Sequence, residues 1–508
     1  MSSFLQGLLL GKNIIMNLKL KEFAKDSLFY AVGHWISKLG SFILVPILSR
    51  IFLPSDYGII DLLNFSYVFT LMIISLNMDT GVQKYYFLRE GEERKILLSS
   101  TMFFRFIFTS LVSFIIVIFS RKISYLVFQR VDYSTAISVL AAALPLADIN
   151  SQLMLLLRLK RRAVSFSVYN VSYVIIQPVL TYVCVVGLQK NIEGVFIAQL
   201  ATIIIISVPL LMQQRSDYAK VIKLREAIHI MKFSLPGLPA IVQGSVLNIL
   251  PRYFLAYFST LTAVGLYGIA DRIANTIEMF KSSFNNAWNP FAFSNAGKAD
   301  EKYLYEQVFR LFALCLLLLI TALAFFAKEI LSLLTPASYH SAAILVGGIC
   351  VYYALRALTL IYSTGLYSVN KVAHTSLLAA VQVVVFVISA VVLVPYYNAM
   401  GLVLSLDVSA LVYFICYGLT VKKYFSFNFS SRRLIIALAL AILGEGYVYH
   451  LSLASNNVTS VNIFLKKLIL LSVYAISSYL IVLKKNERNA IGNRIKSLIS
   501  SSGCQTHL

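Results

Sequence analysis

Fourteen mostly apolar stretches, each long enough to cross a lipid bilayer, run through this chain of 508 residues. A hydrocarbon core of roughly 30 Å requires roughly 20 consecutive apolar residues in a helical span. The stretches lack the apolar/polar alternation of membrane β-barrels, so helices must satisfy the backbone. The sequence therefore predicts an all-α integral membrane protein with about 14 transmembrane helices. The predicted spans are centred near residues 39, 69, 109, 146, 177, 204, 246, 277, 316, 352, 384, 411, 443 and 473.

The formal net charge of +22 would suit a nucleic-acid partner, but its placement along the chain favours a different explanation. With a cytoplasmic N-terminus, the inside loops carry a surplus of +18, the outside loops +4, and the spans none. This is the positive-inside bias of membrane proteins. Clusters such as 158–162 and Lys422-Lys423 are expected to face anionic lipid headgroups. Nucleic-acid binding is not supported, and both termini are predicted to be cytoplasmic.

The two halves of the chain resemble each other at an offset of about 207 residues. Matching positions keep nearly one register, and each half contains six predicted spans. An even number of spans gives both copies the same orientation, so the chain is expected to hold two parallel six-helix repeats. Parallel repeats are typical of transporters, with the substrate site at the repeat interface. The matches include Tyr133 with Tyr339, Asn191 with Asn398, Gly194 with Gly401, Gly58 with Gly265, and Arg105 with Arg310.

The repeat sets the expected division of the chain. The predicted outside loops are all too short to form a catalytic domain. Two extra spans follow the second repeat. The predicted divisions are a cytoplasmic segment at 1–26, repeat 1 at 27–213, a basic cytoplasmic linker at 214–232, repeat 2 at 233–421, two further transmembrane helices at 433–483, and a basic cytoplasmic tail at 484–508.

Polar side chains recur at helical spacing on four spans. Charged groups inside a bilayer are costly, so such stripes usually face a cavity or a partner. The four spans are equivalent under the repeat, which favours one shared cavity over separate interhelical hydrogen bonds. The stripes are His34, Lys38 and Ser41 on the first span, Asp61 and Asn64 on the second, Ser245, Asn248 and Arg252 on the seventh, and Asp271, Asn275, Glu278, Ser282 and Asn285 on the eighth.

The spans of the second copy are richer in basic residues than those of the first. Guanidinium groups favour bidentate contact with phosphate or carboxylate. We expect Arg252, Arg272 and Arg356 to form an anion site, with intramembrane pairing to Glu278 or Asp407 as the alternative. The repeat-equivalent Arg105 and Arg310 lie nearer the cytoplasmic ends, where they are expected to snorkel toward the lipid headgroups.

The sequence contains only weak matches to the motifs of enzyme active sites and metal sites. The run 7–12 (GLLLGK) has one residue too few between its glycines for a phosphate loop, and Asn13 replaces the required Ser or Thr. Five cysteines without a CxxC pair and six scattered histidines predict neither disulfides nor a metal site. We expect no catalytic residues, no cofactor and no metal.

Several short motifs resemble the Wzx-type polysaccharide-biosynthesis flippases of the multidrug/oligosaccharidyl-lipid/polysaccharide exporter superfamily. The similarity covers most of the chain. The matching segments are LVPILSR at 44–50, SDYG at 55–58, FSLP at 233–236, Asn248 with Arg252-Tyr253-Phe254, VGLYGIA at 264–270, and the regions around Tyr339 and Gly401.

This resemblance implies a MATE-like fold and a flippase of the bacterial inner membrane. Its expected substrate is an undecaprenyl-pyrophosphate-linked oligosaccharide, such as an O-antigen repeat unit, moved by ion-coupled alternating access. Partners would include membrane lipids, a proton or sodium ion, and the polysaccharide polymerase and chain-length machinery. The implied cavity residues are Lys38, Arg50, Arg252, Arg272, Arg356, Asn248 and Asn275, and the candidates for ion coupling are Asp61, Asp271, Glu278 and Asp407.

Two other classes remain open at this stage. A multidrug or organic-cation exporter of the same fold would favour an acidic, aromatic cavity, whereas the second copy here is basic. A membrane glycosyltransferase or polymerase would need a large outside loop, which the sequence lacks.

Overall fold

The computed structural model describes residues 44–294, 301–369, 371–424 and 461–483, together with 433, 436–437, 439–441, 443–444, 446 and 488. These residues are helical apart from short connections, and no strand occurs among them. Nine of the described helices are long and apolar enough to span a membrane, or ten when the bent pair Leu224–Gly237 and Ile241–Phe258 counts as one span. The all-α membrane class is thus confirmed, and the chain is a multi-pass membrane protein. The span predicted near residue 39 lies outside the described residues, and so does most of the span near 443.

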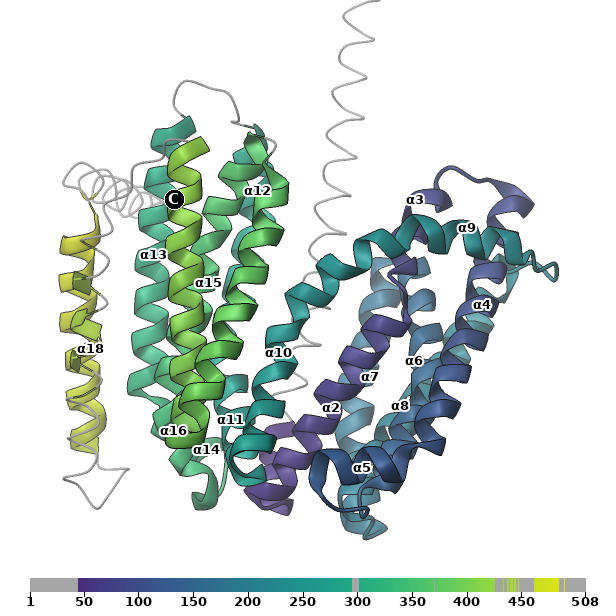
Figure 1. Ribbon diagram of the computed structural model, residues 1–508, viewed down its shortest axis with the longest axis horizontal. Helices are drawn as coiled ribbons and strands as arrows, with labels where there is room; N and C mark the ends of the chain where they lie inside the picture. Colours follow the sequence, from purple (N-terminus) through teal and green to yellow (C-terminus); the bar gives the residue numbers. More distant parts are fainter. Residues whose placement is uncertain are drawn as a thin grey trace, which may run out of the picture. The chain divides into compact units, whose positions relative to one another are not determined.

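The chain divides into two compact units, Met1–Leu250 and Pro251–Leu508, with the division inside helix α10 (Leu238–Phe258). In unit 1, long helices α4, α6 and α8 lie side by side (Figure 1). The elements of unit 1 before α10 are α2 (Pro54–Ile74), α3 (Met78–Tyr86), α4 (Gly91–Ile118), α5 (Ser120–Phe128), α6 (Ser134–Leu159), α7 (Ala163–Tyr182), the π-helix η1 (Val183–Gly187), α8 (Asn191–Gln214), the 3-10 turn η2 (Arg215–Asp217), α9 (Leu224–Ser234) and the 3-10 turn η3 (Leu235–Gly237).

Apolar side chains on the outside of these helices are explained by lipid. Ile107, Leu111 and Phe114 on α4 are 52, 56 and 62% exposed. In a soluble protein such a contiguous apolar face would be a liability, but in a bilayer it is the surface that meets the acyl chains. The inward face of the same helix contributes Leu97 and Leu98 to a buried core with α3, α6 and α9.

Part of the predicted basic linker folds onto unit 1. Residues 224–234 form helix α9, which packs against α3 and α4. The turn before α3 places Leu76 and Asn77 at positive φ (51° and 55°), and Asn77 Nδ2 donates a hydrogen bond of 3.1 Å to the carbonyl of Ser234 at the end of α9. The linker is therefore anchored by its own helix.

Gly81 permits this close packing of α3 on α9. A Cβ added at Gly81 would lie 2.8 Å from Ile230 Cγ2 and 3.2 Å from the Ile230 carbonyl oxygen. We expect Gly81→Ala to lower the free energy of unfolding by about 1–3 kcal/mol through overpacking. Gly244→Ala is the matched control, since a Cβ there meets nothing within 4 Å. Thermal unfolding in detergent measures both variants, and equal melting temperatures would contradict the packing argument.

Unit 2 is also a helical bundle, in which α15 packs against α11, α12, α13 and α16 (Figure 1). Thr260 caps its first complete helix, accepting a hydrogen bond of 3.1 Å from the Ala263 amide. The remaining elements of unit 2 are α11 (Leu261–Ala274), α12 (Thr276–Ser294), α13 (Glu301–Phe325), α14 (Ala327–Leu334), the 3-10 helix η4 (Ala337–Ala342), α15 (Ala343–Ser368), α16 (Val372–Tyr424) and α18 (Val461–Val482).

Helix α16 contains the two spans predicted near residues 384 and 411. Asn398 breaks it with non-helical angles (φ 51°, ψ −130°). Three residues later, a Cβ on Gly401 would lie only 2.7 Å from the carbonyl carbon of Leu393. The repeat-equivalent positions in unit 1 behave alike: Asn191 has φ 44°, and a Cβ on Gly194 would lie 3.1 Å from the Cys184 carbonyl oxygen. The two segments thus have the same local backbone feature, as the predicted repeat implies.

Helix α18, the last helix with described bounds, is joined to α14 within unit 2 by a charge pair. Lys467 Nζ lies 2.6 Å from Glu329 Oε1 on α14, and the lysine side chain is 2% exposed. A lysine in the second turn of an apolar helix is costly where that turn lies in lipid. Its burial against Glu329 fixes which face of α18 turns toward the bundle.

Candidate functional site

Two of the predicted site residues in unit 2 form an ion pair. Arg252 on α10 and Asp271 on α11 are 1% and 5% exposed, with Arg252 Nη2 2.8 Å from Asp271 Oδ2. The hydroxyl of Tyr353 on α15 donates a second hydrogen bond, of 2.8 Å, to Asp271 Oδ1. The Arg252 guanidinium also lies over the Tyr267 ring, 5.2 Å from its centroid. This arginine therefore carries a locally neutralised charge, which weakens its case as an anion receptor.

Arg356 on α15 has a different environment. Its Nη1 donates a hydrogen bond of 3.0 Å to the hydroxyl of Tyr352, one turn earlier, and the guanidinium lies 5.5 Å from the centroid of that ring. The side chain is partly exposed. Among the described residues no carboxylate forms an ion pair with it: Glu278 is near enough to act on it electrostatically but pairs instead with Lys281 Nζ, at 2.7 and 3.0 Å. This group of Arg356, Lys281 and Glu278 has a net charge of +1.

The predicted polar stripe of the eighth span is divided between two helices. Asn275 separates α11 from α12, and its amide still donates to the Asp271 carbonyl at 2.8 Å. Asp271 and Arg272 therefore precede the break, and Glu278 follows it. Arg272 is partly exposed at the end of α11.

The other predicted residues are spread over both units. In unit 1, Arg50 and Asn248 are exposed and Asp61 is fully buried in α2. In unit 2, Asp407 on α16 lies near the backbone of α15, where a Cβ on Gly348 would be 3.4 Å from its Oδ2. Lys38 lies outside the described residues. Within unit 2 the structure thus brings Asp271 to Arg252 and Glu278 near Arg356.

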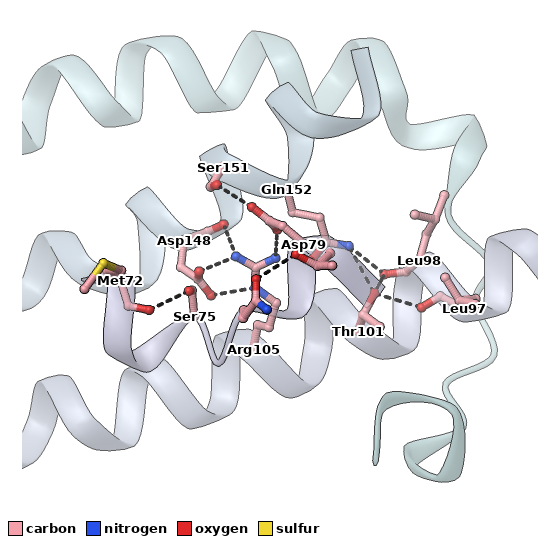
Figure 2. A network of polar contacts seen from close by, with 12 residues as sticks. Met72, Ser75, Asp79, Leu97, Leu98, Thr101, Arg105, Asp148, Ser151 and Gln152 are labelled. Atoms are coloured by element: carbon pink, nitrogen blue, oxygen red, sulfur yellow. Dashed lines mark hydrogen bonds and ion pairs between the residues drawn. The ribbon is translucent and has the colours of Figure 1, made fainter. Parts of the chain in front are cut away.

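Unit 1 contains a charge network that the sequence did not reveal (Figure 2). Arg105 on α4, 2% exposed, extends between Asp148 on α6 and Asp79 on α3. Its Nε is 2.9 Å from Asp148 Oδ2, its Nη2 pairs with Asp148 Oδ1, and its Nη1 is 2.5 Å from Asp79 Oδ1. Ser151 donates to Asp79 Oδ2 at 3.1 Å. Two carboxylates and one guanidinium give the network a formal charge of −1.

The predicted snorkelling of Arg105 and Arg310 is wrong. Both side chains lie inside the protein, Arg310 at 4% exposure with Glu306 3.5 Å from its Nη1. The error has a physical reason. Position along a span gives depth in the membrane but not direction around the helix, and each arginine faces an acid within its own unit. For Arg105 the signal in the sequence was the presence of Asp79 and Asp148 in neighbouring spans, and for Arg310 it was Glu306, four residues earlier on its own helix.

Comparison with known families decides the affiliation of the chain. A family model described as "Polysaccharide biosynthesis protein" matches residues 47–344, more than half of the sequence. The chain belongs to this polysaccharide biosynthesis family. No curated protein matches it.

Solved structures show the fold of this family member. It is similar to the lipid II flippase MurJ in an inward closed conformation, with a TM-score of 0.71, 12% identity, and coverage of 89% of this chain and 98% of that one. It is also similar to an outward-facing multidrug resistance MATE family transporter of the MOP superfamily (TM-score 0.54, 15% identity, 80% and 96% covered). A third similar structure is the MATE multidrug transporter DinF-BH, with a TM-score of 0.56, 14% identity, and coverage of 79% of this chain and 95% of that one. The predicted MATE-like fold is confirmed.

Proposed function

We propose that this polysaccharide biosynthesis protein is a flippase for a polyprenyl-pyrophosphate-linked oligosaccharide in the bacterial inner membrane. The family supplies the glycan context, and the fold is one that a lipid II flippase uses. The observation that carries the proposal is Arg356, a partly exposed guanidinium on a membrane helix whose described partner is a tyrosine hydroxyl. An arginine on a membrane helix with no ion-pair partner among the described residues is costly unless an anionic ligand engages it.

The chemistry of the site fits a phosphate-bearing headgroup better than an organic cation. Arg356 and Lys281 exceed Glu278 by one positive charge, and the hydroxyls of Tyr352 and Tyr413 act on the guanidinium electrostatically. Such donors can hold pyrophosphate oxygens in charge-assisted hydrogen bonds. We propose Arg272 as a further residue that binds the headgroup. The other proposed cavity residues are Arg50, Lys38, Asn248 and Asn275.

We further propose that movement is driven by a proton or sodium gradient through one of Asp61, Asp271, Glu278 and Asp407. The structure pairs Asp271 with Arg252 and Glu278 with Lys281. A carboxylate whose cation is attracted away by an anionic substrate becomes a better site for a proton. The chain performs no covalent chemistry in this scheme.

Deletion of the gene tests the proposal directly. We expect lipid-linked repeat units to accumulate in the inner leaflet and surface polysaccharide to be lost, with drug susceptibility unchanged. Leaflet distribution is measured by enzymatic labelling of the exposed glycan in spheroplasts. Normal surface glycan together with altered drug susceptibility would instead identify a multidrug exporter of the same fold.

A further inference from the structure

An apolar pocket lies on unit 1 between α4 and the chain that joins α8 to α9. Its volume is about 260 Å³, and its lining includes Phe103 and Phe106 of α4, Ile149 of α6, and Ala219 and Ile222 of the connecting chain. Phe103, Phe106 and Ile222 are 45, 40 and 45% exposed, so the pocket opens on the outer surface of the unit. A pocket that encloses a whole small molecule usually measures about 300–1,000 Å³. This one suits a segment of a longer apolar chain.

Hydrogen bonds hold the wall of this pocket in place. Ser99 Oγ donates to the Ala219 carbonyl at 3.0 Å, and the Lys223 amide donates to Ser100 Oγ at 2.8 Å. Residues 219–223 are thereby fixed along α4 at two points. The pocket is therefore a built feature of the unit.

The pocket lies near the level at which the membrane meets water. Helix α4 begins at Gly91 with the polar sequence GEERK, and Ser99 follows about 12 Å further along the axis at 1.5 Å per residue. The apolar lining thus starts about where the charged end of the helix stops. On the positive-inside assignment, this is the cytoplasmic leaflet.

The chain segment that forms one wall of the pocket is rich in positive charge. Residues 215–226 contain four basic and two acidic side chains. Both acids are already paired with cations from other segments, Asp217 with Lys160 and Glu226 with Arg89. Lys220 and Lys223, each following a lining residue in the chain, are exposed and are not neutralised by these acids.

We propose that this pocket binds an anionic phospholipid, with an acyl segment against Phe103 and Phe106 and the headgroup at Lys220 and Lys223. The apolar lining accepts any acyl chain, so selectivity comes from the lysines. Each basic residue at an anionic surface contributes attraction equivalent to about a fivefold gain in affinity. The proposal depends on the membrane location of the chain and is independent of the transported substrate.

Native mass spectrometry of the purified full chain tests this proposal. The protein is delipidated in detergent and then titrated with phosphatidylglycerol, or with phosphatidylcholine of the same acyl composition. We expect one tightly retained phosphatidylglycerol, weaker binding of phosphatidylcholine, and an affinity for phosphatidylglycerol about 25-fold lower in K220Q/K223Q. Ala219→Trp, which fills the pocket, should abolish retention of either lipid. Lys190→Gln at the opposite end of α8 removes one positive charge away from the pocket and should leave the affinity for phosphatidylglycerol unchanged.

Equal binding of the two lipids, or unchanged retention in K220Q/K223Q, would overturn the proposal. The lysine variants alter exposed side chains only, so they decide the question even where Ala219→Trp fails to fold. An unchanged melting temperature of K220Q/K223Q in detergent confirms that lipid binding, and not folding, was altered.

Discussion

Replacing Arg105 by leucine is expected to lower the free energy of unfolding by about 3–5 kcal/mol, the largest stability effect that we predict for a single residue. The guanidinium contacts carboxylates from two other helices, and its removal would leave Asp148, 1% exposed, as an unpaired buried acid. Asp79, at 28% exposure, can be partly hydrated and contributes less. Chemical or thermal unfolding of the purified protein in detergent measures the loss.

Two further variants separate burial from charge in this network. R105L/D148L removes the buried carboxylate together with its cation, and we expect it to recover much of the lost stability, because apolar replacement of a whole buried pair is often nearly neutral. Lys95→Gln breaks a pair with Glu92 whose side chains are 40% and 72% exposed, and should cost at most about 1 kcal/mol. A double variant as unstable as R105L alone would show that Arg105 acts through something other than its acids.

Arg356→Gln is expected to weaken binding of a pyrophosphate-bearing lipid by about 10- to 100-fold. Hydrogen bonds to a charged group are worth about 1.5–3 kcal/mol, and each 1.4 kcal/mol is a factor of ten in affinity. The loss should appear as a higher apparent KM for transport in proteoliposomes carrying a fluorescent polyprenyl-pyrophosphate oligosaccharide. Arg356→Lys keeps the charge but not the planar donors, and should give an intermediate value.

Tyr352→Phe serves as the control for this experiment. It removes the hydroxyl that accepts from Arg356 but keeps both the guanidinium and the aromatic ring. We expect a smaller effect than that of Arg356→Gln, because the charge remains available to the ligand. Transport by Arg356→Gln at the wild-type KM, with the protein folded and inserted, would remove Arg356 from the proposed site.

The membrane class and the fold could be predicted from the sequence because both follow from local properties. Apolar length requires a span, and in lipid a span must be a helix. The likeness of Asn191 and Asn398 was also visible, and both residues adopt positive φ before a closely packed glycine. Patterns of this kind depend on neighbours a few residues away, which the sequence displays directly.

Charge partners could not be predicted in the same way. Arg105 finds Asp148 across 43 positions of sequence, and Tyr353 finds Asp271 across 82. Spacing shows that two residues share a helix face, but it does not show which other helix that face meets. The sequence thus grouped Arg252, Arg272 and Arg356 as equals, whereas the structure neutralises Arg252 and leaves Arg356 with a tyrosine.

The pairing of Lys467 with Glu329 limits how this chain can be truncated. Glu329 belongs to α14, well before the C-terminal helix that supplies its lysine. A truncation that removed α18 would leave a carboxylate at an apolar surface, so the preceding bundle is not self-sufficient as it stands. A viable shorter chain would need a neutral residue at position 329. We therefore expect unit 2 to be more stable with α18 than without it, because α18 supplies the cation for an acid that lies 138 residues earlier in the chain.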